Sequence, residues 1–236
     1  MKTLTVIIPF YNEERTIPEL VRQLNALPDG ILTECIFVDD GSSDSSYELL
    51  RGALEHVGFM SKTISKSNGG KSSAIREATN HLKTTHALIL DADLELNTSD
   101  ITRLWAVIQD GKSEIVFGYR SFLAQSAFTY RYARGNQFLS NLYGLLYNEV
   151  ITDIMCGFKL MPTQYFKECP YRYSKFGLEV ELPLYLWLKR LRPFEISVDY
   201  TPRNREQGKV IGIKDAFQII FDLFVFRIKM AKKRLP

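Results

Sequence analysis

Short apolar runs alternate with amphipathic stretches along the first half of the chain. Residues 4–9, 35–38 and 88–90 form short runs that are apolar except at Thr5, which is typical of strands buried on both faces of a sheet. Residues 16–27 repeat apolar positions at three- and four-residue spacing, as an amphipathic helix does. Alternating strands and helices with short connections predict an α/β layer structure with a mostly parallel sheet.

The pattern of apolar and polar positions predicts helices and strands over the whole chain. Pro9 is expected to end the first strand, and Pro183 to kink a late helix. We expect further strands at residues 62–65, 115–118, 158–161 and 194–200, and helices at 45–56, 71–83, 98–109, 132–147, 178–191 and 214–234. Residues 120–130 are predicted to form a mobile loop, and residues 203–212 a basic loop.

Polar clusters follow the first four predicted strands. They occupy residues 11–14, 39–44, 68–71 and 91–95. In parallel sheets, ligands bind at the carboxyl ends of the strands. Because four clusters are expected along one edge, the sequence favours a binding site there over ordinary polar loops.

Composition narrows the class of protein. The chain has 236 residues, of which 45% are hydrophobic and 24% charged, as expected for a globular core. A net charge of +3 is too small to indicate a nucleic-acid partner. Three scattered cysteines form neither a zinc motif nor a disulfide framework, which suits a reducing cytoplasm. No uncharged apolar run is long enough to span a bilayer.

Asp91, Asp93 and Glu95 stand two residues apart after an apolar run. Residues two apart in a strand point to the same side, so these carboxylates are expected to cluster at a strand tip. Clustered carboxylates recruit a cation, and Mg²⁺ and Mn²⁺ prefer oxygen ligands. The pattern indicates a divalent-metal site, with a solvated acidic turn as the alternative.

Several segments, taken in order, resemble the inverting nucleotide-sugar glycosyltransferases of family 2, which have the GT-A fold. Within that family the chain looks most like the polyprenyl-phosphate hexosyltransferases of the dolichol-phosphate mannosyltransferase type. The matching segments are residues 6–14, 38–44, 90–95, 153–159 and 179–182, then Pro202-Arg203 with Gly208-Lys209. They cover nearly the whole chain.

The resemblance implies a hexosyltransferase (EC 2.4 class) with a UDP- or GDP-hexose donor, a polyprenyl phosphate acceptor and Mg²⁺ or Mn²⁺ as cofactor. It assigns Asp91, Asp93 and Glu95 to the metal, although the branch often has Gln at the third position. It assigns Asp93, Glu181 and Arg203 to catalysis. The acceptor phosphate is assigned to Arg120, Arg134 and the competing Arg131. The donor is assigned to Pro9, Tyr11, Glu13, Asp39, Asp40, Lys71, Asp91, Ala92, Arg203 and Lys209.

Each role has a plainer alternative. Tyr11 is equally a core aromatic, Lys71 equally a helix start, and any of the arginines equally a partner of a surface acid. Glu181 is needed as a base only for a hydroxyl acceptor, since a phosphate oxygen is already ionised. Other functions remain open: transfer to a glycan or glycolipid hydroxyl, a sugar-nucleotidyltransferase, or a non-enzymatic nucleotide-binding module. Phe10 to Glu13 stand where a nucleotidyltransferase would want a Gly-rich loop.

The last 23 residues are predicted to form a separate element, residues 214–236, after a catalytic domain of residues 1–213. Their helix combines a broad apolar face with basic residues, which favours an interfacial helix on anionic lipid. A core or dimer helix is the alternative. We expect a cytoplasmic protein, held peripherally at the cytoplasmic face of a membrane if this helix docks there. The basic residues are Arg227, Lys229, Lys232, Lys233 and Arg234.

Overall fold

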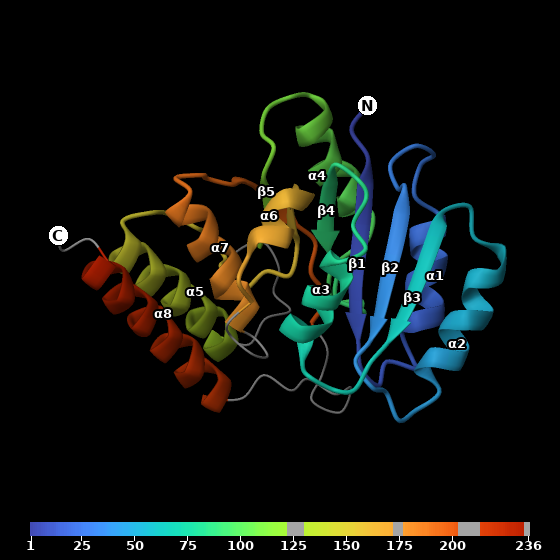
Figure 1. The fold of residues 1–236 in the computed structure, drawn as a ribbon, viewed down its shortest axis with the longest axis horizontal. Helices are drawn as coiled ribbons and strands as arrows, with labels where there is room; N and C mark the ends of the chain where they lie inside the picture. The colour runs from blue at the N-terminus through green and yellow to red at the C-terminus, as the bar shows by residue number, and fades with distance from the viewer. Residues whose placement is uncertain (122–129, 172–176, 203–212, 234–236) are drawn as a thin grey trace.

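The computed structural model describes residues 1–121, 130–171, 177–202 and 213–233 (Figure 1). Strands and helices alternate through the first half, as predicted. The strands are β1 (Leu4–Phe10), β2 (Glu34–Asp39), β3 (Met60–Ser65), β4 (His86–Ile89), β5 (Val116–Arg120), β6 (Lys159–Pro162) and β7 (Phe194–Val198). The helices are α1 (Ile17–Asn25), α2 (Ser46–Ala53), the 3₁₀ turn η1 (Leu54–His56), α3 (Lys71–Thr79), α4 (Asp100–Gln109), α5 (Tyr130–Tyr147), α6 (Thr163–Glu168), α7 (Leu178–Leu188) and α8 (Ile213–Lys233).

Strand β1 lies inside a seven-stranded sheet whose order is β3-β2-β1-β4-β6-β5-β7. Strands β1 to β4 are parallel to their neighbours in this group, and β5 is parallel to β7. Strand β6 is antiparallel to β4 and β5. The mostly parallel α/β sheet is therefore confirmed, and the carboxyl ends of β1 to β4 lie along one edge.

The first strand continues through Pro9 to Phe10, whereas the sequence predicts a stop at Pro9. The carbonyl of Ile7 accepts a hydrogen bond from the Leu90 N–H on the β4 side, and the carbonyl of Phe10 accepts one from Asp40 on the β2 side. Amides of successive strand residues alternate in direction, so the Pro9 nitrogen faces the β4 side. Pairing of β1 with β4 has already ended there at Ile7. A proline is tolerated because no ladder hydrogen bond is lost.

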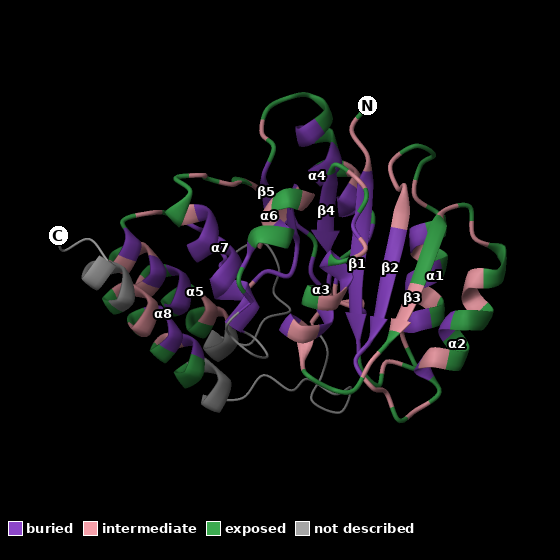
Figure 2. Cartoon of the chain, in the orientation of Figure 1, coloured by how far each residue is buried: buried purple, intermediate pink, exposed green. Residues whose placement is uncertain are grey.

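Strands β1, β2 and β4 are mostly buried (Figure 2), and apolar side chains form a core on each face of the sheet, as the apolar runs predict. On one face, α1, α2 and α4 cover a core that includes Leu4, Val6 and Ile8 of β1. On the other face, α3, α5, α6, α7 and α8 contribute to a core that includes Ile7. The result is a three-layer arrangement that holds the edge loops on a rigid base.

Helices α5 and α8 lie side by side at the end of the molecule away from β3 (Figure 1). Ile219 and Leu223 of α8 are buried, and the Tyr147 hydroxyl donates to the Leu223 carbonyl at 2.6 Å. The Trp187 indole N–H in turn donates to the Tyr147 carbonyl at 3.0 Å. One side of α8 therefore belongs to the core. Among the described helices, none is both long and apolar enough to cross a membrane.

Some predicted boundaries are wrong. Arg120 closes β5 rather than opening a loop, because β5 pairs with β7 up to Val198. The loop predicted after it falls on residues 122–129, outside the described residues. Helix α7 ends at Leu188, and α6 is a short helix that the pattern did not indicate. Six residues are too few to show a helical period, which explains that omission.

Candidate active site

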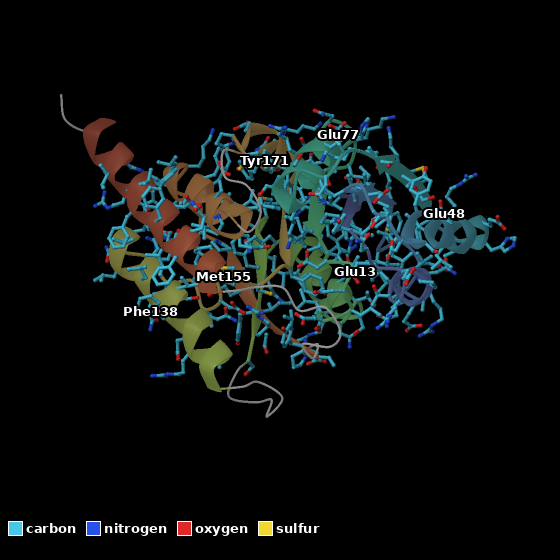
Figure 3. The ribbon with its side chains drawn as sticks, turned by 90° about the horizontal axis from the view of Figure 1, so that it is seen from below. Glu13, Glu48, Glu77, Phe138, Met155 and Tyr171 are labelled. Carbon is cyan, nitrogen blue, oxygen red and sulfur yellow. The ribbon has the colours of Figure 1, made fainter. Side chains whose placement is uncertain are left out.

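The loops that follow β1 and β2 contact each other at the carboxyl edge of the sheet, which Figure 3 views from below. The Asn12 N–H donates to Ser42 Oγ at 3.0 Å, and the Ser43 N–H donates to Asn12 Oδ1 at 2.8 Å. The N–H of Glu13, labelled in Figure 3, donates to Ser46 Oγ at 2.7 Å. These contacts confirm that the polar clusters after β1 and β2 meet, as the strand order predicts.

Asp39 ends β2 and Asp40 follows it, and each residue is only 4% exposed. Asp40 accepts hydrogen bonds from the N–H groups of Gly69 and Gly70, the latter at 2.6 Å, and from Lys66 Nζ at 2.7 Å. The N–H groups of Gly69 and Gly70 therefore bind a carboxylate of the protein. Asp40 joins the loops after β2 and β3 into one wall of the site.

The other residues predicted for the nucleoside lie on the β1 side. Pro9 is buried within the strand, while 48% of the Tyr11 surface is exposed. Glu13 accepts a hydrogen bond from Thr16 Oγ1 at 2.9 Å at the start of α1. The exposure of Tyr11 argues against the core-aromatic alternative and leaves its ring accessible to a base.

Asp91 and Asp93 follow β4 directly and are half-buried. The two-residue spacing predicts an extended chain through Glu95, but the chain turns at Ala92 and Asp93. Leu94 has a φ of +57°, a left-handed conformation uncommon for leucine, and the Glu95 N–H donates to Asp93 Oδ1 at 3.0 Å. The acids therefore lie on a turn rather than in a strand row. Glu95 Oε2 accepts a hydrogen bond from the Tyr200 hydroxyl at 2.6 Å.

The Asp91 carboxylate rests against the backbone at Gly157. A Cβ atom on Gly157 would stand 2.6 Å from Asp91 Oδ2 and 3.4 Å from Leu96 Cδ1. Such an approach is closer than real Cβ atoms make, so only glycine fits without a shift. The Asp91 side chain remains 29% exposed, so a ligand can reach it.

A line of four alternating charges, which we call the charge chain, runs from Asp91 into the core. Lys71 Nζ, at the start of α3, lies 2.6 Å from Asp91 Oδ1 and 2.6 Å from Glu179 Oε1. Lys159 Nζ, on β6 and almost fully buried, donates to Glu179 Oε2 at 2.5 Å. Burial raises the pKa of Glu179, but the two lysines outweigh burial and hold that pKa below its ordinary value. Burial also lowers the pKa of Lys71, and the two carboxylates reverse this and raise it.

Glu179 and Glu181 lie on different faces of α7, as their spacing predicts. Glu179 reaches the site through Lys71. Glu181 is 1% exposed and lies near Cys169 and Tyr171. The pKa of Tyr171 is raised by burial first, then by Cys169 and then by Glu181. A catalytic role for Glu181 remains a prediction, and Glu179 is the glutamate linked to Asp91 through Lys71.

Arg120 pairs in a bidentate manner with Asp153, whose side chain is fully buried. Its Nε donates to Asp153 Oδ2 at 2.6 Å, and a terminal nitrogen donates to Oδ1 at 2.9 Å. The guanidinium carbon also lies 5.0 Å from the centre of the Tyr200 ring. Since Tyr200 donates to Glu95, this contact ties the turn after β4 to β5 and to the segment 153–159. The residue predicted for the acceptor phosphate thus has a carboxylate partner here.

The remaining predicted residues are only partly described. Arg134 is on α5 and donates to Gln137 Oε1 at 3.1 Å. Arg131 lies in the first turn of α5, and its side chain is outside the described part of the chain. Arg203 and Lys209 fall within residues 203–212, also outside it. Their roles remain predictions.

Asp91 and Asp93 fit a divalent cation that takes further ligands from a nucleotide. Across residues 1–121, 130–171, 177–202 and 213–233, no group of three His, Cys, Asp or Glu forms a complete metal centre. Mg²⁺ is commonly held by one or two carboxylates together with substrate phosphates rather than by an all-protein cage. The space that Gly157 leaves for the Asp91 carboxylate is the structural feature that favours such a site.

Four residues of this arrangement have no role in the sequence reasoning: Lys159, Asp153, Gly157 and Tyr200. The first three stand in a matching segment, but a motif match alone does not say what each side chain contacts. Lys159 carried the clearest signal. It interrupts the predicted buried strand 158–161, and a lysine in such a position must find a charged or hydrogen-bonding partner.

The three layers, with a mostly parallel sheet and carboxylates at its carboxyl edge, have the arrangement of a GT-A fold. The sequence profile of glycosyl transferase family 2 matches residues 5–169. The chain belongs to glycosyl transferase family 2.

The undecaprenyl-phosphate 4-deoxy-4-formamido-L-arabinose transferase of Edwardsiella ictaluri is 28% identical over 223 residues, covering 93% of this chain and 66% of that protein. The transferase of the same name from Salmonella paratyphi A is 35% identical over 114 residues, which are 47% of this chain and 35% of that one. The chain therefore spans at most about two thirds of these relatives.

Solved structures support the fold. Glucosyl-3-phosphoglycerate synthase from Mycobacterium tuberculosis, crystallised with Mn²⁺, UDP and glucosyl-3-phosphoglycerate, superposes with a TM-score of 0.72 at 17% identity. That match covers 95% of this chain and 80% of the synthase. The same enzyme with Mg²⁺ and UDP gives a TM-score of 0.70 at 16% identity, covering 95% and 79%. At this identity the likeness establishes the fold alone.

Proposed function

We propose that this protein is an inverting glycosyltransferase that moves a hexose from UDP- or GDP-hexose to a polyprenyl phosphate, with Mg²⁺ or Mn²⁺. The observation that carries the proposal is the partly exposed Asp91 carboxylate at the carboxyl edge of a family 2 fold, seated in the space left by Gly157. The acceptor class rests on relatives named for transfer involving undecaprenyl phosphate. The metal and the diphosphate are supported by solved neighbours that contain Mn²⁺ or Mg²⁺ with UDP.

The donor is proposed to lie across the loops after β1, β2 and β4. Tyr11, exposed beside β1, suits stacking on the base, and the buried pair Asp39 and Asp40 shapes the pocket wall. Asp91 and Asp93 would hold the cation, which when bound supplies charge stabilisation to the departing diphosphate. Pro9, Glu13, Ala92, Arg203 and Lys209 complete the proposed donor contacts.

The acceptor is proposed to approach from the side of α5. Arg134 and Arg131 on that helix are our candidates for the lipid phosphate, because a guanidinium fork matches a phosphate. Arg120 could also bind the phosphate only while its guanidinium group keeps its ion pair with Asp153. The phosphate oxygen forms the new bond to the anomeric carbon while the bond to the diphosphate breaks. That oxygen is ionised near neutral pH, so a lipid-phosphate acceptor needs no protein base, and Glu181 would act as one only toward a hydroxyl.

A screen of the full chain tests the proposal. Purified protein is incubated with UDP- and GDP-hexoses, and with UDP-pentoses because the relatives are named as transferases of an arabinose derivative. The acceptors are undecaprenyl and dolichyl phosphate in detergent, with Mg²⁺ or Mn²⁺. We expect one donor to give sugar on lipid phosphate, together with an equal amount of nucleoside diphosphate. Sugar found only on an added glycan or glycolipid hydroxyl would overturn the acceptor assignment.

The outer side of α8 is proposed to lie on an anionic membrane surface. Phe217, Phe221, Phe224 and Ile228 form an apolar stripe along it, each at least 44% exposed. The first three also line a groove of about 580 Å³. Arg227 and the basic residues that follow it suit anionic lipid, and a lipid-linked acceptor would be delivered there. Phe138 of α5, labelled in Figure 3, is also exposed at this end of the molecule.

Replacing Phe217 and Phe221 together with serine is expected to weaken binding to anionic vesicles by at least about tenfold, since burying one phenylalanine contributes about 1.5–3 kcal/mol. Co-sedimentation with phosphatidylglycerol vesicles measures this. The matched control is Met60→Ser, which removes an equally exposed apolar side chain from β3 at the far end of the sheet. Unchanged vesicle binding, with loss of a dimer in sedimentation velocity, would instead assign the stripe to a second copy of the chain.

A further inference from the structure

The two ends of the charge chain, Asp91 and Lys159, both contact the segment 154–157 beside the proposed metal site. Lys159 Nζ donates to the carbonyl oxygens of Cys156 and Ile154 as well as to Glu179. Cys156 directly precedes Gly157, against which Asp91 rests. The same lysine therefore fixes the backbone behind Asp91 and, through Glu179, the ammonium group in front of it. Every member of this circuit is held on a different element: β6, α7, α3 and the turn after β4.

The charges within the chain balance. Two ammonium groups face two carboxylates, and Lys71 divides its contacts equally between Asp91 and Glu179 at 2.6 Å each. Lys71 has a 17% exposed side chain, while Glu179 has only 4%, so much of this charge is shielded from water. A bare divalent cation on Asp91 would stand next to the Lys71 ammonium, and like charges at such a distance repel strongly where water is scarce.

The net charge beside Lys71 is different when the metal ion binds together with a nucleoside diphosphate. The diphosphate supplies the negative charge that the cation lacks, so cation and lysine no longer repel as strongly. Lys71 need not leave the site, because Glu179 remains as its partner and is itself held by Lys159. Lys71 can therefore remain paired with Glu179 when Asp91 binds a metal ion.

We propose, on the basis of the proposed function, that Lys71 is an internal counter-ion, paired with Asp91 in the donor-free protein. This pairing makes binding of the metal ion depend on the nucleoside diphosphate. Glu179 and Lys159 are positioning residues that hold Lys71 for this exchange. Donor-free protein therefore binds Mn²⁺ poorly, and Asp91 is kept in place and neutralised until the metal and nucleotide enter together.

The test measures Mn²⁺ binding to the full chain by electron paramagnetic resonance, without turnover. In the absence of nucleotide, Lys71→Met is expected to bind Mn²⁺ at least tenfold more tightly than the wild type. Lys71→Gln, which keeps a polar group but no charge, is expected to change Mn²⁺ binding in the same direction. If thermal melting shows that Lys71→Met is not folded, Lys71→Gln takes its place in the test. UDP and GDP, in separate arms, are expected to tighten Mn²⁺ binding far more in the wild type than in either variant.

The matched control is Lys66→Met. It removes a lysine–carboxylate pair of similar burial on the neighbouring loop, and Asp40 keeps the N–H groups of Gly69 and Gly70 as partners. Its nucleotide-free Mn²⁺ affinity should equal that of the wild type. Unchanged or weaker Mn²⁺ binding in both Lys71 variants would overturn the counter-ion role while leaving the metal site intact. No Mn²⁺ binding by any of these proteins, even with UDP or GDP, would overturn the metal site of the proposed function and this inference with it.

Discussion

Asp93→Ala is expected to lower sugar transfer by at least about 1,000-fold, which corresponds to about 4 kcal/mol of transition-state stabilisation. The charge that develops on the departing diphosphate has to be neutralised, and Asp93 is one of the two carboxylates proposed to hold the cation that does so. Asp93 also accepts the Glu95 N–H that shapes the turn after β4. The measurement is the initial rate of transfer at saturating donor, together with metal-dependent nucleotide binding.

Asp110→Ala is the control for this substitution. Asp110 is an exposed acid that pairs with Lys112 beyond the end of α4, away from the carboxyl edge of the sheet. Its loss should leave transfer within about twofold, because exposed ion pairs contribute little. Asp93→Asn separates the two roles of the residue, since the amide oxygen still accepts the turn hydrogen bond while the charge is gone. Full activity in Asp93→Ala would remove the metal assignment.

The sheet and its edge are predictable from the sequence because both depend on local patterns. Buried strands such as β1 and β2 read as apolar runs, and a polar cluster follows each one. Once a parallel sheet is inferred, the clusters must meet at its carboxyl edge. The contact between Asn12 and Ser42, which are thirty residues apart, is the outcome of that rule.

The partners of the site residues are not predictable in the same way. Lys71 meets Glu179 across 108 positions of sequence, and no periodicity links a helix start to a glutamate on α7. The choice between Glu179 and Glu181 depends on how α7 is rotated against β6, which is decided by packing. Alignment with the family motif favours Glu181, whereas packing turns Glu179 toward Lys159 and the site.

The acid motif shows the same limit at short range. An extended Asp-x-Asp-x-Glu row would present three carboxylates together, but the left-handed Leu94 turns the chain between Asp93 and Glu95. A positive φ at a leucine costs conformational energy, so local sequence rules do not predict a turn at Leu94. Here the turn is fixed from outside, by the Tyr200 hydroxyl on Glu95 and the bridge between Leu96 and Tyr200.

Gly157→Ala is the second substitution expected to have a large effect, although it adds only one methyl group. The new Cβ atom would stand 2.6 Å from Asp91 Oδ2, so either the carboxylate or the backbone at residue 157 must move. The backbone cannot yield easily, because Lys159 holds the carbonyls of Ile154 and Cys156 just before it. The Asp91 carboxylate is therefore expected to shift, and a misplacement of about 1 Å in a catalytic group can cost about 100-fold in rate.

We accordingly expect Gly157→Ala to lose about 100-fold or more in transfer and to weaken Mn²⁺–UDP binding, while remaining folded. The matched control is Gly52→Ala in α2, where an added Cβ meets no atom within 4 Å. That substitution should leave activity unchanged and stabilise the protein by about 0.5–1 kcal/mol, because alanine is favoured over glycine inside a helix. Transfer rates and thermal melts of the two variants decide the matter. Normal transfer by Gly157→Ala would mean that Asp91 need not occupy the space beside Gly157 for catalysis.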